Sequence, residues 1–292
     1  MSHHHQDAPV TYPSYLRLAE LLTLQHPRSS PEHPDELLFI VVHQASELWF
    51  KVLLHELDIL IARMDGDDTL GALSATKRVN ALVQIITNQL SSLETLPPQR
   101  FAEFRGYLGT SSGSQSEQFR AIEAKSGLRD AHFMQAISEH GEPPALVREA
   151  LGRPTLQETF ERMVERAGTS LEAIYTDPEQ SALFMLGESL IEYEQGFAMW
   201  RFLHVQLVER VIGPVTGGTG GTLGAKYLTR TVSQRFFPSL WEVRSKFYGS
   251  AESKCRCTTS ACSPAPGRRS GRGTPRSAAA GPRGSLMDRA ST

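Results

Sequence analysis

Apolar positions recur with a helical period along most of this chain, and the alternation typical of strands is almost absent. From Asp35, a predicted N-cap, to about Ala62 nearly every side of a helix is apolar, which predicts a long, central, buried helix. A second long helix is predicted over the apolar run from Leu183 to Ile212. Shorter helices are predicted near residues 12–22, over 69–96 (ended by a Pro-Pro pair), re-entering near 114–116, over 130–140, 143–151 and 155–174, and in a last segment ending near 248. The predicted fold class is all-α, a single-domain helical bundle.

The composition divides the chain into three parts. Residues 1–10 are expected to be a disordered N-terminus and residues 11–249 one folded domain. From about residue 250 the chain is rich in Ser, Gly, Pro, Arg and Ala, so residues 250–292 are expected to form a disordered basic tail.

Charge and cysteine usage narrow the class of protein. The 292 residues carry a formal net charge of −2, which gives no reason to expect nucleic acid or an anionic membrane as partner. Neither an apolar run of membrane-spanning length nor a signal peptide is recognisable, so the expected location is cytoplasmic. All three cysteines lie in the tail, so a metal in the core would have to be held by His or carboxylate.

Two histidines interrupt the two long apolar helices. His204 shares a helical face with apolar and aromatic residues, and His43 stands beside Gln44, Ser46 and Glu47. A buried histidine on its own more often bonds a backbone carbonyl or water than a metal, and a pair with Lys51 at i+4 is the simplest explanation for Glu47.

The spacing of these histidines excludes two metal classes. No Glu is followed three residues later by His, which argues against a di-iron bundle. A zinc-hydrolase H-E-x-x-H motif is also absent. A helical scaffold with one histidine on an apolar face and a second polar histidine fits a haem pocket better.

Two further features could bind a ligand. The Gly-rich loop over residues 217–224 lacks the G-K-[ST] ending of a P-loop, and is either a helix stop with a flexible connector or a mobile lid that grips a carboxylate or ammonium. Arg105, at a predicted helix end beside a Gly/Ser loop, could hold a carboxylate with two hydrogen bonds, although a surface salt bridge is the commoner fate of such a residue.

Several blocks together resemble the tryptophan 2,3-dioxygenase family. His43-Gln44-Ala45-Ser46-Glu47-Leu48-Trp49 is similar to its H-Q-x-x-E-L-W signature. Phe104-Arg105, Ser112-Gly113-Ser114-Gln115-Ser116 and Gln118-Phe119-Arg120 resemble its second block. Trp200-Arg201-Phe202 with His204, then Thr219-Gly220-Gly221 and Phe236-Phe237-Pro238, resemble its haem-ligand helix, glycine loop and C-terminal block. The resemblance runs in family order from about Tyr12 to Tyr248.

The resemblance implies a role for each matching residue. His204 would be the proximal ligand to the iron of haem b, and His43 the distal, catalytic imidazole that accepts a hydrogen bond from an indole N–H. Arg105 would bind the substrate carboxylate, and Thr219 would close over the polar end of the amino acid. The remaining positions implied are Phe39 and Phe101 against the indole, Leu108 and Ser112 near the haem, and Tyr12 and Tyr15 in a segment that reaches a neighbouring subunit's pocket in a homotetramer.

The implied reaction uses haem b and O2 to open the indole ring of L-tryptophan or a substituted tryptophan to an N-formylkynurenine. Four departures from the family pattern leave room for an alternative. They are Ser114 where the family has Phe, Thr110 where it has Pro, about one extra residue before Thr219, and a shorter stretch between Arg120 and His204. These changes suit a relative in secondary metabolism, similar to maremycin-type indole oxygenases, that mono-oxygenates a β-substituted tryptophan to an oxindole-type product. A haem sensor without turnover has no need for a carboxylate clamp such as Arg105, and a cofactor-free interaction domain leaves the polar residues 43–47 unexplained.

Overall fold

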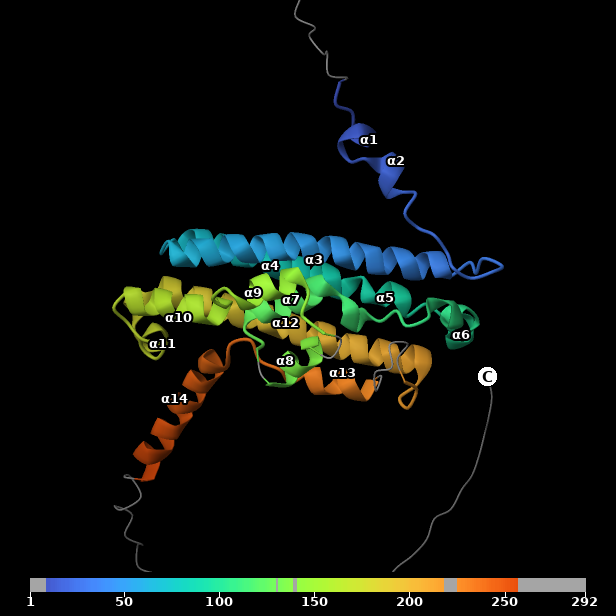
Figure 1. The fold of residues 1–292 in the computed structure, drawn as a ribbon. Helices are drawn as coiled ribbons and strands as arrows, with labels where there is room; N and C mark the ends of the chain where they lie inside the picture. Colours follow the sequence, from blue (N-terminus) through green and yellow to red (C-terminus); the bar gives the residue numbers. More distant parts are fainter. Residues whose placement is uncertain (1–8, 130, 139–140, 218–224, 257–292) are drawn as a thin grey trace, which may run out of the picture. The chain divides into compact units, whose positions relative to one another are not determined.

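A computed structural model describes residues 9–129, 131–138, 141–217 and 225–256. Within these residues the fold consists of helices joined by turns and loops. No strand occurs among these residues, so the all-α prediction is confirmed (Figure 1). The α-helices are α1 (Tyr12–Tyr15), α2 (Leu18–Leu21), α3 (Glu36–Asp65), α4 (Thr69–Asn88), α5 (Leu90–Leu93), α6 (Pro98–Arg105), α7 (Glu117–Ser126), α8 (Ala131–Ser138), α9 (Ala145–Leu151), α10 (Leu156–Arg166), α11 (Ala173–Thr176), α12 (Ser181–Ile212), α13 (Ala225–Thr231) and α14 (Pro238–Arg256). Three 3₁₀ turns accompany them, η1 (Gly106–Leu108), η2 (Gly113–Gln115) and η3 (Pro178–Gln180).

Three long helices, α3, α4 and α12, form the centre of the fold. α4 packs against both α3 and α12, while α7 and α10 cover further parts of α3 (Figure 1). Their shared core consists of fully buried aliphatic and aromatic side chains, among them Leu53, Leu57, Val79, Leu186 and Tyr193. Burial of this apolar surface is the main stabilising contribution to such a bundle.

The prediction of a buried α3 is wrong for part of the helix. Leu37, Val41, Leu48 and Val52 are 39–52% exposed, whereas Leu57 is fully buried. The helix is apolar on nearly all sides, and its neighbours within one chain cover only some of them. By length and composition alone, α3 is also the one helix among the described residues that could cross a membrane, with 22% of its apolar window buried.

Several helix boundaries differ from the sequence prediction. The predicted helix over 69–96 divides into α4 and α5, and Pro98 begins α6, where its missing N–H is harmless. Asp35 is the N-cap residue of α3 but makes no capping hydrogen bond, because its carboxylate pairs with Arg100. The helix predicted over 155–174 ends at Arg166, and the last segment is two helices, α13 and α14. The re-entry near Ser116 is confirmed, since its hydroxyl accepts a hydrogen bond from the Phe119 N–H (3.1 Å).

The chain separates into two compact units, residues 1–247 and 248–292. All the residues of the candidate site belong to the first unit. Of the residues predicted to be disordered, 250–256 are helical as the end of α14, and most of the others lie outside the described part, where the disorder stays a prediction.

Candidate active site

His43 and His204 lie on different central helices, α3 and α12, and their rings are near enough to influence each other's protonation. Burial first, and the His43 imidazole second, lower the pKa of His204 to about 4. Burial also lowers the pKa of His43, against opposing effects of the Phe39 carbonyl and the Glu47 carboxylate. Both side chains nevertheless retain solvent contact. The two rings therefore come near each other at a place that solvent, and hence a ligand, can reach.

The surroundings of His43 are aromatic. The Phe39 ring lies 4.2 Å from the His43 ring, centroid to centroid, and 5.5 Å from the Phe101 ring. Phe104 meets the Phe101 ring edge-on at 5.2 Å. Leu108, Val211 and Ile212 pack against this cluster, which therefore joins α3, α6 and the end of α12. Such a wall offers a flat apolar surface to an aromatic ligand.

The hydrogen bond of His43 determines which ring nitrogen faces the ligand. His43 Nδ1 lies 2.7 Å from the carbonyl oxygen of Phe39, one turn earlier on α3. A carbonyl only accepts, so Nδ1 carries the proton. In the neutral ring Nε2 is then an unprotonated acceptor, and the lowered pKa keeps the ring neutral around pH 7.

The polar residues that follow His43 fasten neighbouring segments to α3. The Gln118 amide donates to the carboxylate and to the backbone carbonyl of Glu47 (2.8 Å each). The Gln44 amide donates to the carbonyl of Leu24 (3.1 Å), and Ser46 Oγ accepts from Gln89 (2.6 Å). The structure therefore replaces the predicted Glu47–Lys51 pair with a link from α3 to α7, a contact too distant in the sequence for a local pattern to predict.

His204 is held by packing and by an ion pair one turn earlier on α12. The Trp200 ring stacks on the His204 ring at 5.1 Å and 25°. Arg201, 3% exposed, donates to the buried Glu123 carboxylate of α7 (2.8 Å), which also accepts from Arg120 (2.8 Å). Breaking a buried ion pair is strongly destabilising. Because α12 cannot rotate about its axis without separating Arg201 from Glu123, this contact fixes the orientation of the helix. The same contact also fixes the side of α12 on which His204 lies.

Arg105 lies in the last turn of α6 and donates to the backbone carbonyl of Gly217. No salt bridge of Arg105 is present among the described residues, so its guanidinium retains donors for an anion. Thr219 lies outside the described residues, two positions after Gly217.

The remaining predicted site residues are spread over two places. Ser112 is the N-cap residue of η2, and its hydroxyl lies 2.9 Å from that of Ser114. Tyr12 and Tyr15, on α1, are 74% and 76% exposed, and α1 and α2 contain no buried residue. Within the described residues of one chain these tyrosines therefore have little packing. Phe104 and Trp200 contact the candidate site residues Phe101 and His204. Their positions, three or four residues away on the same helices, could have indicated these contacts from the sequence.

The metal-ligating side chains of the site fit a metal ion that receives most of its ligands from a cofactor and only one from the protein. Among the described residues no group of three or more His, Cys, Asp and Glu side chains could enclose a metal ion. The His204 ring, however, has no hydrogen-bond partner in that part of the chain, and Leu203 and Leu207 of the same helix belong to an apolar cluster. One imidazole toward an apolar, accessible space is what an iron porphyrin requires from its protein. The arrangement is compatible with a helical haem protein.

Comparison with known proteins gives the same class and narrows it. The family model described as "Tryptophan 2,3-dioxygenase" matches residues 1–167 and 159–247. The tryptophan 2,3-dioxygenase of Kineococcus radiotolerans is 39% identical over 261 residues, which cover 81% of this chain and 91% of that relative. Those of Saccharopolyspora erythraea and Caulobacter vibrioides are each 38% identical over 81% of this chain and 92% and 98% of their own lengths. The chain belongs to the tryptophan 2,3-dioxygenase family, and is thus a haem-dependent oxidoreductase of the dioxygenase type.

Proposed function

We propose that this enzyme adds both atoms of O2 to the indole ring of L-tryptophan or a substituted tryptophan and releases an N-formylkynurenine. The observation that supports the proposal is the pair of imidazoles on α3 and α12 that influence each other's protonation, with aromatic rings beside His43. The names of the relatives support the same substrate and reaction.

The proposed cofactor is haem b, with His204 as the ligand to its iron. Leu108 and Ser112 would lie near the porphyrin, since Leu108 packs with the aromatic cluster and Ser112 follows it closely in the chain. Ferrous haem would supply the site that holds O2 for the reaction. The lowered pKa of His204 keeps its ring neutral, which is the form that binds iron.

The protein's own contribution is to orient the amino acid. His43 Nε2 would accept the indole N–H, with Phe39 and Phe101 against the faces of the ring system. Arg105 would hold the carboxylate, and its bond to the Gly217 carbonyl would connect that carboxylate to the segment carrying Thr219. Positioning of this kind lowers the barrier without strong acid–base catalysis.

Replacing His43 tests the acceptor role. His43→Ala should retain haem and lower kcat/KM for L-tryptophan roughly 10-fold, because one hydrogen bond to the substrate is lost. Only the neutral ring accepts, and its pKa is lowered from 6.5, so the acidic limb of kcat/KM should lie below pH 6.5 and vanish in His43→Ala. If the acidic limb is unchanged in His43→Ala, another group causes the pH dependence. If the variant loses haem, His43 is the iron ligand and the proximal and distal assignments are reversed.

The homotetramer is part of the proposal. Apolar side chains of the N-terminal segment are largely exposed in a single chain, including Val10 at 78% and Leu22 at 70%. The exposed stripe of α3 is also apolar and lies on the helix that carries His43. We propose that Tyr12 and Tyr15 complete the pocket of a neighbouring subunit, which would cover both surfaces.

The decisive experiment is mass spectrometry of the product formed under ¹⁸O2. The haem-loaded protein is supplied with L-tryptophan and, separately, with β-methyltryptophan. Two label atoms in a ring-opened product are the expected result. A single label atom in an oxindole-type product would replace the proposal by mono-oxygenation, and the better of the two substrates would identify the substrate class.

A further inference from the structure

A short segment before α3, residues 28–35, contacts α6, and we call it the strap. Its own conformation depends on the buried carboxylate of Glu36, the first residue of α3. The backbone N–H groups of Arg28 and Ser29 donate to this carboxylate (2.7 and 3.0 Å), and the Ser29 hydroxyl accepts from the N–H of His33 (2.7 Å). Burial raises the pKa of Glu36, but the donors of Ser29 and Arg28 lower it overall, so the carboxylate is ionised at neutral pH. The strap is therefore a loop of defined conformation.

Three side chains of α6 and η1 contact the strap at intervals of three and four residues, which places them on one face. The contacts, each with its strap partner, are Arg100 with Asp35, Glu103 with His33 (2.9 Å) and Tyr107 with Ser30 (3.0 Å). The adjacent face of α6 carries Phe101, Phe104 and Arg105. The strap and the candidate site thus use adjacent faces of the same short helix.

His33 makes the most enclosed of the strap contacts. Its side chain is 10% exposed, and its ring lies 5.1 Å from the ring of the fully buried Phe104. Its Nδ1 accepts from the N–H of Asp35 (3.2 Å), so in the neutral ring Nε2 carries the proton and donates to Glu103. Both ring nitrogens therefore have partners, and the ring is held between the strap and α6.

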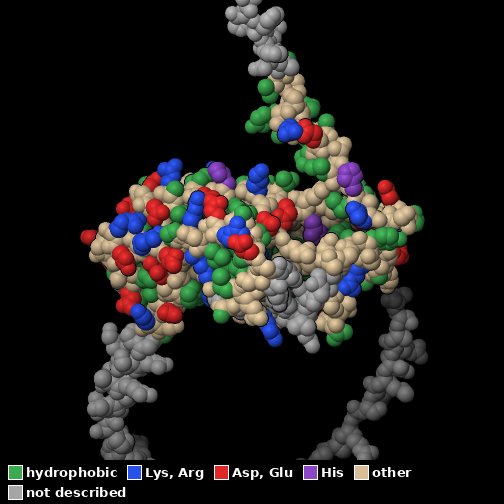
Figure 2. Space-filling model, in the orientation of Figure 1, with side chains coloured by type: hydrophobic (Ala, Val, Ile, Leu, Met, Phe, Trp, Pro, Cys, Tyr) green, Lys and Arg blue, Asp and Glu red, His purple; other side chains and the backbone are tan. Residues whose placement is uncertain are grey.

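Isolated ion pairs at the surface would be a simpler explanation of these contacts. Acidic and basic side chains are interspersed over the face of the molecule in Figure 2, and exposed pairs of this kind contribute little to stability. That explanation is sufficient for Arg100 and Asp35, which are both partly exposed. It does not account for the enclosed His33, or for Tyr107, whose hydroxyl donates to a backbone carbonyl.

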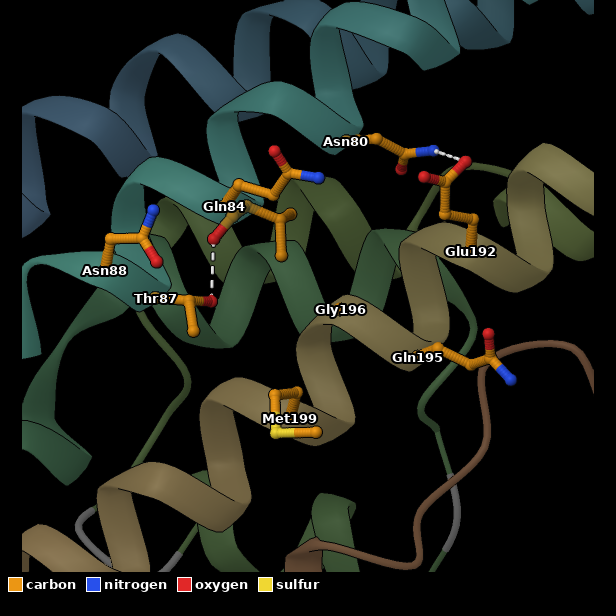
Figure 3. A pocket seen from close by; sticks show the side chains of 9 residues that line it. Asn80, Gln84, Thr87, Asn88, Glu192, Gln195, Gly196 and Met199 are labelled. Atoms are coloured by element: carbon orange, nitrogen blue, oxygen red, sulfur yellow. Dashed lines mark hydrogen bonds between the residues drawn. The ribbon is translucent and has the colours of Figure 1, made fainter.

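The support of α6 differs from that of the long central helices. α4 and α12 bond each other directly, as in the hydrogen bond from Asn80 to Glu192 (3.0 Å; Figure 3). α6 has only eight residues, too few for a stable helix without tertiary contacts. The apolar cluster of Phe101 and Phe104 holds one face of α6, and the strap holds the adjacent face. The position of α6 therefore depends on both.

We propose, on the basis of the carboxylate-binding role proposed for Arg105, that His33 is a positioning residue for that arginine. It holds the last turn of α6, and with it the guanidinium of Arg105, in place for the carboxylate of the amino acid. The strap contacts adjoin Arg105 on both sides in the chain, at Glu103 and Phe104 before it and at Tyr107 after it. A small displacement of this turn would move the guanidinium away from the carboxylate, and binding depends on that geometry.

Replacing His33 in the haem-loaded protein tests the positioning role. His33→Leu should raise KM for L-tryptophan roughly 5- to 10-fold and leave kcat nearly unchanged, because binding is weakened by about the value of one hydrogen bond. Equilibrium binding of indole, which has no carboxylate, should not change. His33→Gln should remain close to the wild type, because its amide N–H can still donate to Glu103. Arg100→Leu removes the strap contact in the first turn of α6, far from Arg105 along the helix, and is the matched control with a nearly unchanged KM.

A double variant separates positioning from a general loss of structure. If His33 acts through Arg105, His33→Leu should raise KM no further in an Arg105→Leu background, because the effects of coupled residues do not add. Additive effects, or equal losses of tryptophan and indole binding in His33→Leu, would overturn the role of His33. An Arg105→Leu variant that does not distinguish tryptophan from indole would overturn the carboxylate clamp itself, and the role of His33 with it.

Hydrogen exchange of the full-length protein without substrate gives a readout that is independent of activity. In His33→Leu the amides of residues 98–105 should exchange several-fold faster, whereas those of α10 should not change. If His33→Leu does not fold, Glu103→Ala, at an exposed side chain, should produce the same changes in KM and exchange. Unchanged exchange of residues 98–105 in the folded variant would show that His33 does not hold α6.

Discussion

His204→Ala should abolish haem binding while leaving the helical fold intact. His204 is the proposed iron ligand, and its ring has no hydrogen-bond partner among the described residues whose loss would disturb the helix. Even partners that only orient a metal ligand contribute about 10- to 100-fold in affinity, so removal of the ligand itself should weaken haem binding by more than about 100-fold. The measurement is haem titration followed by the Soret band, with circular dichroism to verify the helix content.

His55→Ala is the matched control for that experiment. His55 lies on α3, is exposed to solvent, and is not among the proposed site residues, so its removal should leave the Soret band unchanged. A His204→Ala protein that binds haem as tightly as the wild type, with the same spectrum, would refute the ligand assignment. Recovery of a Soret band when imidazole is added to His204→Ala would support it, since the small molecule would occupy the vacated ligand position.

Arg105→Leu should raise KM for L-tryptophan roughly 10- to 100-fold, because a charge-assisted hydrogen-bond pair to the carboxylate is lost. The same substitution should have little effect on binding of indole, which has no carboxylate. Steady-state oxygen consumption with tryptophan and equilibrium titration with indole separate the two effects.

Arg100→Leu controls for the loss of one positive charge from the same helix. Arg100 pairs with Asp35 at the start of α3 and has no proposed contact with substrate, so this variant should alter stability more than KM. Equal losses of tryptophan and indole binding in Arg105→Leu would mean that Arg105 supports the shape of the pocket instead of holding a carboxylate. The Gly217 carbonyl would then be its principal partner.

The position of the candidate site was predictable because its motifs are local. His43 and the residues that follow it occupy consecutive positions of one helix, and the periodicity of α12 shows which residues share a face with His204. Arg105 at the end of α6 and the helix start after Ser116 also follow from nearby residues. Short-range patterns of this kind require no knowledge of which helices are neighbours.

Contacts between distant segments could not be predicted in the same way. The carboxylate of Glu47 has Lys51 as its obvious local partner, yet it bonds Gln118, 71 positions away. Asp35 has the composition and position of a helix cap, but Arg100 occupies its side chain instead. In both cases a longer-range partner competes successfully with the local one, and only packing decides which partner is within reach.

The sequence by itself determined that the protein is helical, where most of its helices lie, and which histidines and arginine belong to the tryptophan 2,3-dioxygenase family pattern, because periodicity and motif spacing are properties of neighbouring residues. The tertiary structure decided that His43 and His204 come near each other, that Nδ1 of His43 bonds the Phe39 carbonyl and leaves Nε2 as the acceptor, and that one side of α3 is exposed within a single chain. These properties depend on how α3, α4, α6 and α12 pack, and packing depends on pairs of residues that are far apart in the chain.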